Sequence, residues 1–143
     1  MSKSKKIFKV IPETTSIYHG LKLSELRKVV LEYYNKNLKD REVFNEDLKI
    51  TIRFSMSSGR KTVMGEAMYY KKAEIMKILP EIVQYALYNN YGERKETDNP
   101  SVIGYLNFKG KCKLDGKIEN IRLAVQFQKT AKFYYNVEVN KIK

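Results

Sequence analysis

The sequence predicts an α+β protein in which N-terminal helices pack on one face of a small antiparallel sheet, a C-terminal β-meander. In the first two thirds of the chain, most apolar residues recur at helical spacing, whereas from residue 102 onward they alternate with polar residues as in half-buried strands. An Asp-Gly pair between two of the alternating runs adds a hairpin signal. With 143 residues and 43% hydrophobic content, we expect a single domain over residues 1–143, with residues 1–17 as a partly ordered basic segment.

The first helix is predicted from Leu26 onward. Apolar residues after Leu26 recur at the spacing of one helix face, and Ser24 precedes them as a candidate N-cap. We therefore expect an amphipathic helix of about 15 residues.

A strand is predicted at residues 48–56, "LKITIRFSM". There the apolar residues, such as Ile50, Ile52 and Phe54, alternate with polar ones, such as Thr51 and Arg53. This period of two is typical of a strand with one buried face.

Residues 71–90, "KKAEIMKILPEIVQYALYNN", return to helical spacing as far as Leu87. Pro80 suits the first turn of a second helical piece better than a helix interior, so we expect a break near Leu79. The polar residues 90–101, "NYGERKETDNPS", have no period and are predicted to form a loop.

The C-terminal strands are predicted at residues 102–114, 117–128 and 133–142. Asp115-Gly116 is the expected two-residue turn, flanked by Leu114 and Lys117, and this register puts Phe108 on the same buried side as its partner on the return strand, Leu123. The apolar face of the first strand is expected to carry Val102, Leu106, Phe108, Cys112 and Leu114.

The net charge is +12, from 28 Lys and Arg against 16 Asp and Glu. Such an excess favours a polyanionic partner, nucleic acid before an anionic membrane.

No apolar run has the length of a membrane span or signal sequence, so we expect a protein of the cytoplasm without a membrane partner. Cys112 and His19 are the single residues of their types, and we therefore expect no disulfide framework, metal site, cofactor or Ser-His-Asp triad.

The polar face of the predicted sheet is the candidate binding surface. Cations there would hold phosphates, and tyrosines would stack on the bases of single-stranded RNA. The alternative is that these residues only keep the sheet soluble. If the strands pair in order, the residues on this face are Arg53, Tyr105, Asn107, Lys109, Lys111, Arg122, Gln126 and Tyr134.

The segment "SSGRK", residues 57–61, has two interpretations. It lacks the spacing of a Walker loop, so one interpretation is a plain polar turn at Ser57-Ser58-Gly59. The other is a phosphate site, because Arg60 and Lys61 beside Arg53 would repel one another without an anion between them. Both can hold together.

Five segments in this order resemble the large polyvalent protein-associated domain 3 family of phage and conjugative-element proteins. They are "LKLSELRKVVLEYYNKNL", "ITIRFSMSSGRKT", "KILPEIVQYALY", "YLNFKGKCKLDGKIENIRLAVQF" and "YYNVEV", and the resemblance covers roughly residues 18–143. The layout is similar to the barnase, EndoU, colicin and RelE superfamily of metal-independent ribonucleases, whose open sheet face receives RNA. The resemblance thus implies an RNA-binding domain of a mobile genetic element in a bacterial host cell.

Histidines that the family tends to carry near Leu106 and near Asn136 or Val137 are absent from this chain. Chemistry of the RelE kind would instead use Arg60, Lys61, Arg122 and Tyr134 as catalytic groups, while Ser58 and the rest of the polar face would bind RNA. Two alternatives remain: a domain that binds RNA without cutting it, and a non-catalytic phage or plasmid protein that blocks a host defence complex handling nucleic acid.

Overall fold

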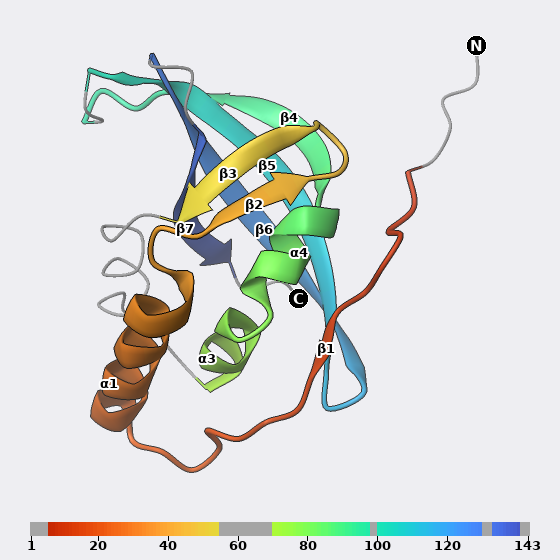
Figure 1. The fold of residues 1–143 in the computed structure, drawn as a ribbon, viewed down its shortest axis with the longest axis vertical. Helices are drawn as coiled ribbons and strands as arrows, with labels where there is room; N and C mark the ends of the chain where they lie inside the picture. Colours follow the sequence, from red (N-terminus) through yellow and green to blue (C-terminus); the bar gives the residue numbers. More distant parts are fainter. Residues whose placement is uncertain (1–5, 55–69, 98–99, 130–132, 141–143) are drawn as a thin grey trace.

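The computed structural model describes residues 6–54, 70–97, 100–129 and 133–140, the last as backbone only. Within these ranges the chain forms three α-helices and a seven-stranded sheet, so the predicted α+β class is confirmed. Figure 1 shows the helices gathered on one side of the sheet, while the long β5–β6 hairpin extends past them to its turn.

Helix α1 spans Leu23–Tyr33 and continues into a short π-helical turn, η1, at Tyr34–Leu38. It starts earlier than predicted, and the Lys22 N–H, rather than Ser24, marks its beginning by donating to the Glu25 carboxylate at 3.1 Å.

The second helical region is divided as predicted. Helix α3 (Tyr70–Met76) ends before α4 (Leu79–Tyr85) begins, and Pro80 lies in the first turn of α4. A proline is tolerated there because the N–H groups of the first turn make no hydrogen bond within the helix, so the missing N–H of proline costs nothing.

The sheet contains β1 (Glu13–Thr14), β2 (Glu42–Asn45), β3 (Ile50–Phe54), β4 (Leu87–Glu93), β5 (Val102–Leu114), β6 (Lys117–Gln128) and β7 (Phe133–Asn140). The order is β1-β5-β6-β7-β3-β2, and β4 also pairs with β5. The predicted β5–β6–β7 meander is confirmed. The prediction of a wholly antiparallel sheet is wrong: β3 runs parallel to β7 and β1 runs parallel to β5. A parallel pair needs a long crossover, and the chain between β3 and β7 contains α3, α4, β4, β5 and β6.

The predicted hairpin register is confirmed. Asp115 and Gly116 have φ values of 52° and 81°, as a two-residue hairpin turn requires, and Leu114 pairs with Lys117. Phe108 pairs directly with Leu123, and both side chains are only 2% exposed. The face that they share is therefore the buried one.

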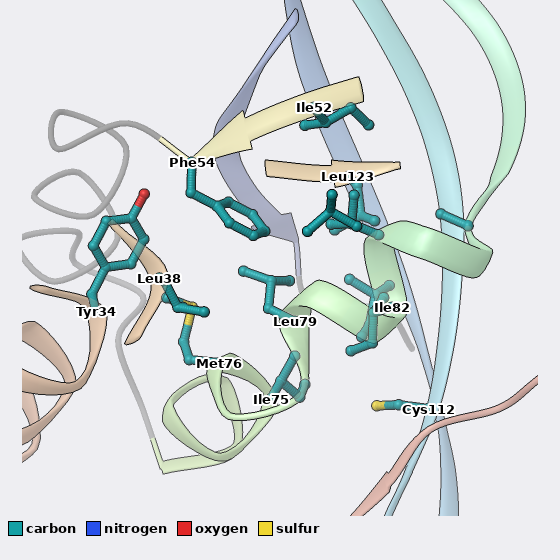
Figure 2. Packing of buried hydrophobic residues seen from close by; sticks show 14 of the residues in the cluster. Tyr34, Leu38, Ile52, Phe54, Ile75, Met76, Leu79, Ile82, Cys112 and Leu123 are labelled. Atoms are coloured by element: carbon teal, nitrogen blue, oxygen red, sulfur yellow. The ribbon is translucent and has the colours of Figure 1, made fainter. Parts of the chain in front are cut away.

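The core lies between this face and the helices. In Figure 2, Phe54 and Leu123 from the sheet lie over Leu79 and Ile82 from α4, and Cys112 closes the far end. Helix α1 joins the same cluster through Leu26 and Val30. None of the described helices packs against the opposite face of β5 and β6.

Two predictions for residues 71–101 are wrong. The helix does not continue to Leu87, and residues 90–93 do not belong to a loop, because β4 occupies Leu87–Glu93. The cause is the buried side chain of Asn45, whose Nδ2 donates to the carbonyl oxygens of Val83 and Ala86 at 2.8 and 3.0 Å. These bonds satisfy carbonyls at the end of α4 and let the chain turn into a strand at Ala86.

The N-terminal segment, described from residue 6, pairs with β5 near its turn, beyond the residues of β5 that pair with β4. The Pro12 carbonyl accepts a hydrogen bond from Lys113, and the Thr14 carbonyl accepts one from Asp115. Ser16 donates from both its N–H and its hydroxyl to the Asp115 carboxylate. We call residues 6–21 the arm; it is attached to the sheet at several points.

Candidate nucleic-acid interface

The uncovered side of β5 and β6, which we call the open face, carries the polar residues that the sequence predicted. Residues directly opposite each other in an antiparallel pair point to the same side. The register therefore places together Tyr105 with Gln126, Asn107 with Ala124, Lys109 with Arg122 and Lys111 with Asn120.

The backbone register extends this face to β7 and β3. Gln126 pairs with Tyr134, and Tyr134 pairs with Arg53, so the predicted positions on four strands form one row that includes Tyr105. Arg53 is not a bare cation, since its Nη2 lies 3.1 Å from Oδ1 of Asp40. Its charge is partly neutralised inside the protein.

A hollow of about 490 Å³ opens on this face between β4, β5 and β6. We call it the asparagine hollow. Its polar lining consists of Asn89, Asn90, Asn107, Lys109 and Arg122. Ala124 lies in its wall, and Phe108 and Leu123 contribute main chain because their side chains point into the core.

An irregularity in β4 shapes the hollow. The pairing of β4 with β5 shifts between Tyr88 and Asn90, so Asn89 is an extra residue, and both asparagines line the hollow. Asn107 on β5 donates from Nδ2 to Oδ1 of Asn90 at 2.9 Å. The two amides thus form a fixed pair at the wall.

Lys109 and Arg122 are the charged part of the hollow. They are direct cross-strand partners and both are exposed. No carboxylate in the described part of the chain pairs with either of them. Like charges directly opposite in a sheet are destabilising, which makes this an attractive position for an anion.

Tyr105 does not offer the stacking surface that we expected. It lies on the predicted face but is only 8% exposed, because it packs with Val102 and Ala124, and Lys95 Nζ lies 6.0 Å from its ring centroid. Val102 belongs to this open-face cluster and not, as predicted, to the face of Phe108. The pairing shifts between Val102 and Gly104, which reverses the side to which Val102 points.

Lys111 and Gln126 lie on the open face outside the hollow. Lys111 Nζ is 5.3 Å from the ring centroid of Phe8 in the arm. The Gln126 side chain accepts a hydrogen bond from Gln128 at 2.8 Å. The predicted site is therefore divided: Asn107, Lys109 and Arg122 line the hollow together, whereas Lys111 and Gln126 lie outside it.

Ser58, Arg60 and Lys61 lie outside the described residues, as does the side chain of Tyr134. Of the four predicted catalytic residues, Arg122 alone has a described side chain, and it lies in the hollow.

The described residues contain no group of His, Cys, Asp and Glu side chains that could hold a metal ion. His19 packs edge-on against Tyr70 of α3, with ring centroids 5.2 Å apart, and it does not line the hollow. Among the helices that are described, none is long and apolar enough to cross a membrane.

Sequence reasoning missed Asn89 and Asn90, two of the three hollow asparagines. The signal was the Asn-Asn dipeptide before Tyr91, which favours a break in a helix. It was hidden because Leu87 continues the helical spacing of the preceding residues.

The fold thus defines a class of protein: an α+β domain with helices on one side of its sheet and a basic open face on the other. The model of the large polyvalent protein-associated domain 3 family matches residues 22–135, and the chain belongs to that family. Membership links the chain to polyvalent proteins and, in general, to mobile genetic elements. The arm, residues 6–21, precedes the matched residues. No curated protein and no solved structure matches the chain.

Proposed function

We propose that this protein is an RNA-binding domain of a mobile genetic element and that single-stranded RNA lies across its open face. One observation carries the proposal: Lys109 and Arg122 face each other across the β5–β6 ladder, beside a hollow, without a counter-charge among the described residues. A phosphate between them would turn a repulsive pair into two charge-assisted hydrogen bonds.

Single-stranded RNA fits this surface better than a duplex does. In an RNA duplex the major groove is deep and narrow, so side chains cannot reach the base edges there. The unstacked bases of a single strand, in contrast, can enter a pocket on the protein. The asparagine hollow offers amide groups for such bases beside cations for the backbone. The net charge of +12 adds a long-range attraction for any RNA.

Binding without cleavage is the form of this function that the hollow favours. Cleavage of RNA without a metal needs a group that removes the proton of the 2′-hydroxyl. The described lining contains no histidine, aspartate or glutamate, so Arg122 could stabilise negative charge but has no evident base beside it. A binder of this kind would act stoichiometrically on its RNA.

A binding assay with matched variants tests the proposal. Fluorescence anisotropy with a labelled single-stranded RNA should show at least a tenfold loss of affinity for Lys109→Ala/Arg122→Ala, since charge-assisted bonds contribute about 1.5–3 kcal/mol each. The control Lys28→Ala/Lys36→Ala removes the same charge from exposed residues of α1 and η1. An equal loss of RNA affinity in both variants would mean that the protein attracts RNA only through its overall charge, and it would contradict a site at Lys109 and Arg122.

A turnover assay separates binding from cleavage. Total RNA incubated with substoichiometric protein in EDTA should remain intact if the domain only binds. Degradation that disappears in Arg122→Ala would instead establish a metal-independent endoribonuclease.

A further inference from the structure

The pair of amides in the hollow has unused hydrogen-bonding capacity. Within the described residues, the bond from Asn107 to Asn90 is the only one that either side chain makes. It leaves Oδ1 of Asn107 as an acceptor and Nδ2 of Asn90 as a donor. Exchanging the oxygen and nitrogen assignments of both amides leaves the same combination, one acceptor and one donor group.

The backbone around this pair keeps it in place and uncovered. Gly92 on β4 lies beside Asn107, and a Cβ on it would come within 3.1 Å of the Asn107 Nδ2. With glycine there, the amide has room to lie over the neighbouring strand. The extra residue Asn89 in β4 brings Asn90 opposite Asn107.

Adjacent donor and acceptor groups are what the hydrogen-bonding edge of a nucleobase requires. Asparagine reads adenine in this manner in DNA, and unstacked RNA bases are bound through their Watson–Crick and Hoogsteen edges. The hollow volume of about 490 Å³ lies within the range for small-molecule sites, about 300–1,000 Å³. Lys109 and Arg122 line the same hollow: Lys109 follows Asn107 by two residues on β5, and Arg122 pairs with Lys109 from β6.

We infer that the asparagine hollow holds one unstacked nucleotide of the bound RNA. Asn90 and Asn107 bind the edge of its base, and Lys109 and Arg122 bind its phosphate. The inference rests on the proposed RNA binding but goes beyond it, because an open face that held only phosphates would be indifferent to the bases. This site therefore requires bases as well as charge.

An abasic oligonucleotide provides the direct test. Two labelled probes of equal length are compared: a single-stranded RNA of mixed sequence and a ribose-phosphate strand of the same charge without bases. The wild-type protein should bind the RNA about tenfold more tightly, as expected for one well-made base contact. In Asn90→Ala/Asn107→Ala this preference should vanish, while affinity for the abasic strand stays unchanged.

Asn120→Ala is the matched control, because Asn120 is an exposed asparagine on the same face outside the hollow. It should retain the preference for bases. Equal affinity of the wild-type protein for both probes would overturn the nucleotide site while leaving RNA binding intact. Failure of both probes to bind would overturn the proposed function itself.

A second measurement locates the base. Titration of ¹⁵N-labelled protein with the four nucleoside 5′-monophosphates should shift the side-chain amide signals of Asn90 and Asn107, with smaller shifts from inorganic phosphate. Shifts by phosphate and nucleotide that are identical at these two amides would contradict base binding.

Discussion

Lys77 Nζ lies 2.6 Å from Oε1 of Glu74, a carboxylate with no exposed surface. The other oxygen, Oε2, accepts hydrogen bonds of 2.7 Å from the N–H groups of both Ile17 and Tyr18. The contact with Lys77 is an ion pair rather than an aligned hydrogen bond. Glu74 of α3 thus binds the main chain of the arm and holds the arm against the rest of the domain.

Replacing Glu74 with Ala should destabilise the protein strongly. The change leaves the N–H groups of Ile17 and Tyr18 without their acceptor and Lys77 without its counter-charge, and breaking a buried pair in this way costs about 3–5 kcal/mol. Urea denaturation followed by circular dichroism measures the change. Glu32→Ala, at an exposed position of α1, is the control and should alter the free energy of unfolding by less than about 0.5 kcal/mol. A small effect of Glu74→Ala would mean that the arm contributes little to stability.

Replacing Gly110 with Ala should also destabilise the protein. A Cβ at this buried position of β5 would lie 2.8 Å from Cγ2 of Ile82 in α4, so the helix and the strand would have to separate. Overpacking of this kind costs about 1–3 kcal/mol. Thermal unfolding measures the loss. In the double variant with Ile82→Ala the two effects should be less than additive, since the clashing methyl is gone.

Acid should weaken the fold below pH 3.8. Burial acts to raise the pKa of Asp47, but hydrogen bonds from Lys6 and from the Tyr88 N–H, with the Lys6 charge, lower it below its ordinary value of 3.8. Hydrogen bonds from the hydroxyl and N–H of Ser16 lower the pKa of Asp115 likewise. A carboxylate whose pKa is lower in the folded protein contributes stability that is fully present above the unfolded value and is lost as pH falls through the folded one.

Urea denaturation between pH 6 and pH 2 should show that the free energy of unfolding falls as the pH is lowered. In Asp47→Asn this fall should be smaller. The variant should also be less stable than the wild type at pH 6. An identical decline in both proteins would assign the acid sensitivity to other carboxylates.

Cys112 should be inert in the native protein. Burial, with a smaller effect from Glu119, raises the pKa of its thiol to about 12, and its side chain is fully buried. Since the thiolate is the reactive form, a thiol reagent such as iodoacetamide should modify the unfolded protein at pH 8 and leave the native protein unmodified. Mass spectrometry distinguishes the two. Rapid modification without denaturant would show that the core opens at β5.

The affinity for single-stranded RNA should fall steeply with salt. Each phosphate contact contributes about −0.7 to the slope of log K against log salt, and Lys109 and Arg122 share one phosphate, so Lys109→Ala/Arg122→Ala should reduce the magnitude of the slope by about 0.7. Anisotropy titrations from 50 to 300 mM salt measure both slopes. An affinity that does not respond to salt would point to a protein partner in place of RNA.

The alternation of apolar and polar residues predicted most of the β5–β6 hairpin, because the Asp115-Gly116 turn alone determines its register. Once Asp115-Gly116 is the turn, the period of two assigns every side chain of β5 and β6 to a face, as far as Gly104. Beyond that residue an irregularity reverses Val102, and the period of two alone does not reveal it.

The end of α4 could not be predicted in this way. The helix stops because Asn45, about 40 residues earlier in the chain, binds the carbonyl groups of Val83 and Ala86. Nothing in residues 79–90 encodes that contact. Since β4 depends on this stop, the two asparagines that it brings to the hollow were equally hidden.

The parallel pairing of β3 with β7 has a consequence for how the chain is made. Residues 50–54 find their inner neighbour only in β7, where Phe54 pairs with Tyr135, so during synthesis the β2–β3 hairpin has one unpaired edge until about 80 further residues have left the ribosome. An exposed strand edge is a template for pairing with other chains. Nascent molecules on neighbouring ribosomes are therefore expected to be most vulnerable to aggregation just before residue 140 emerges.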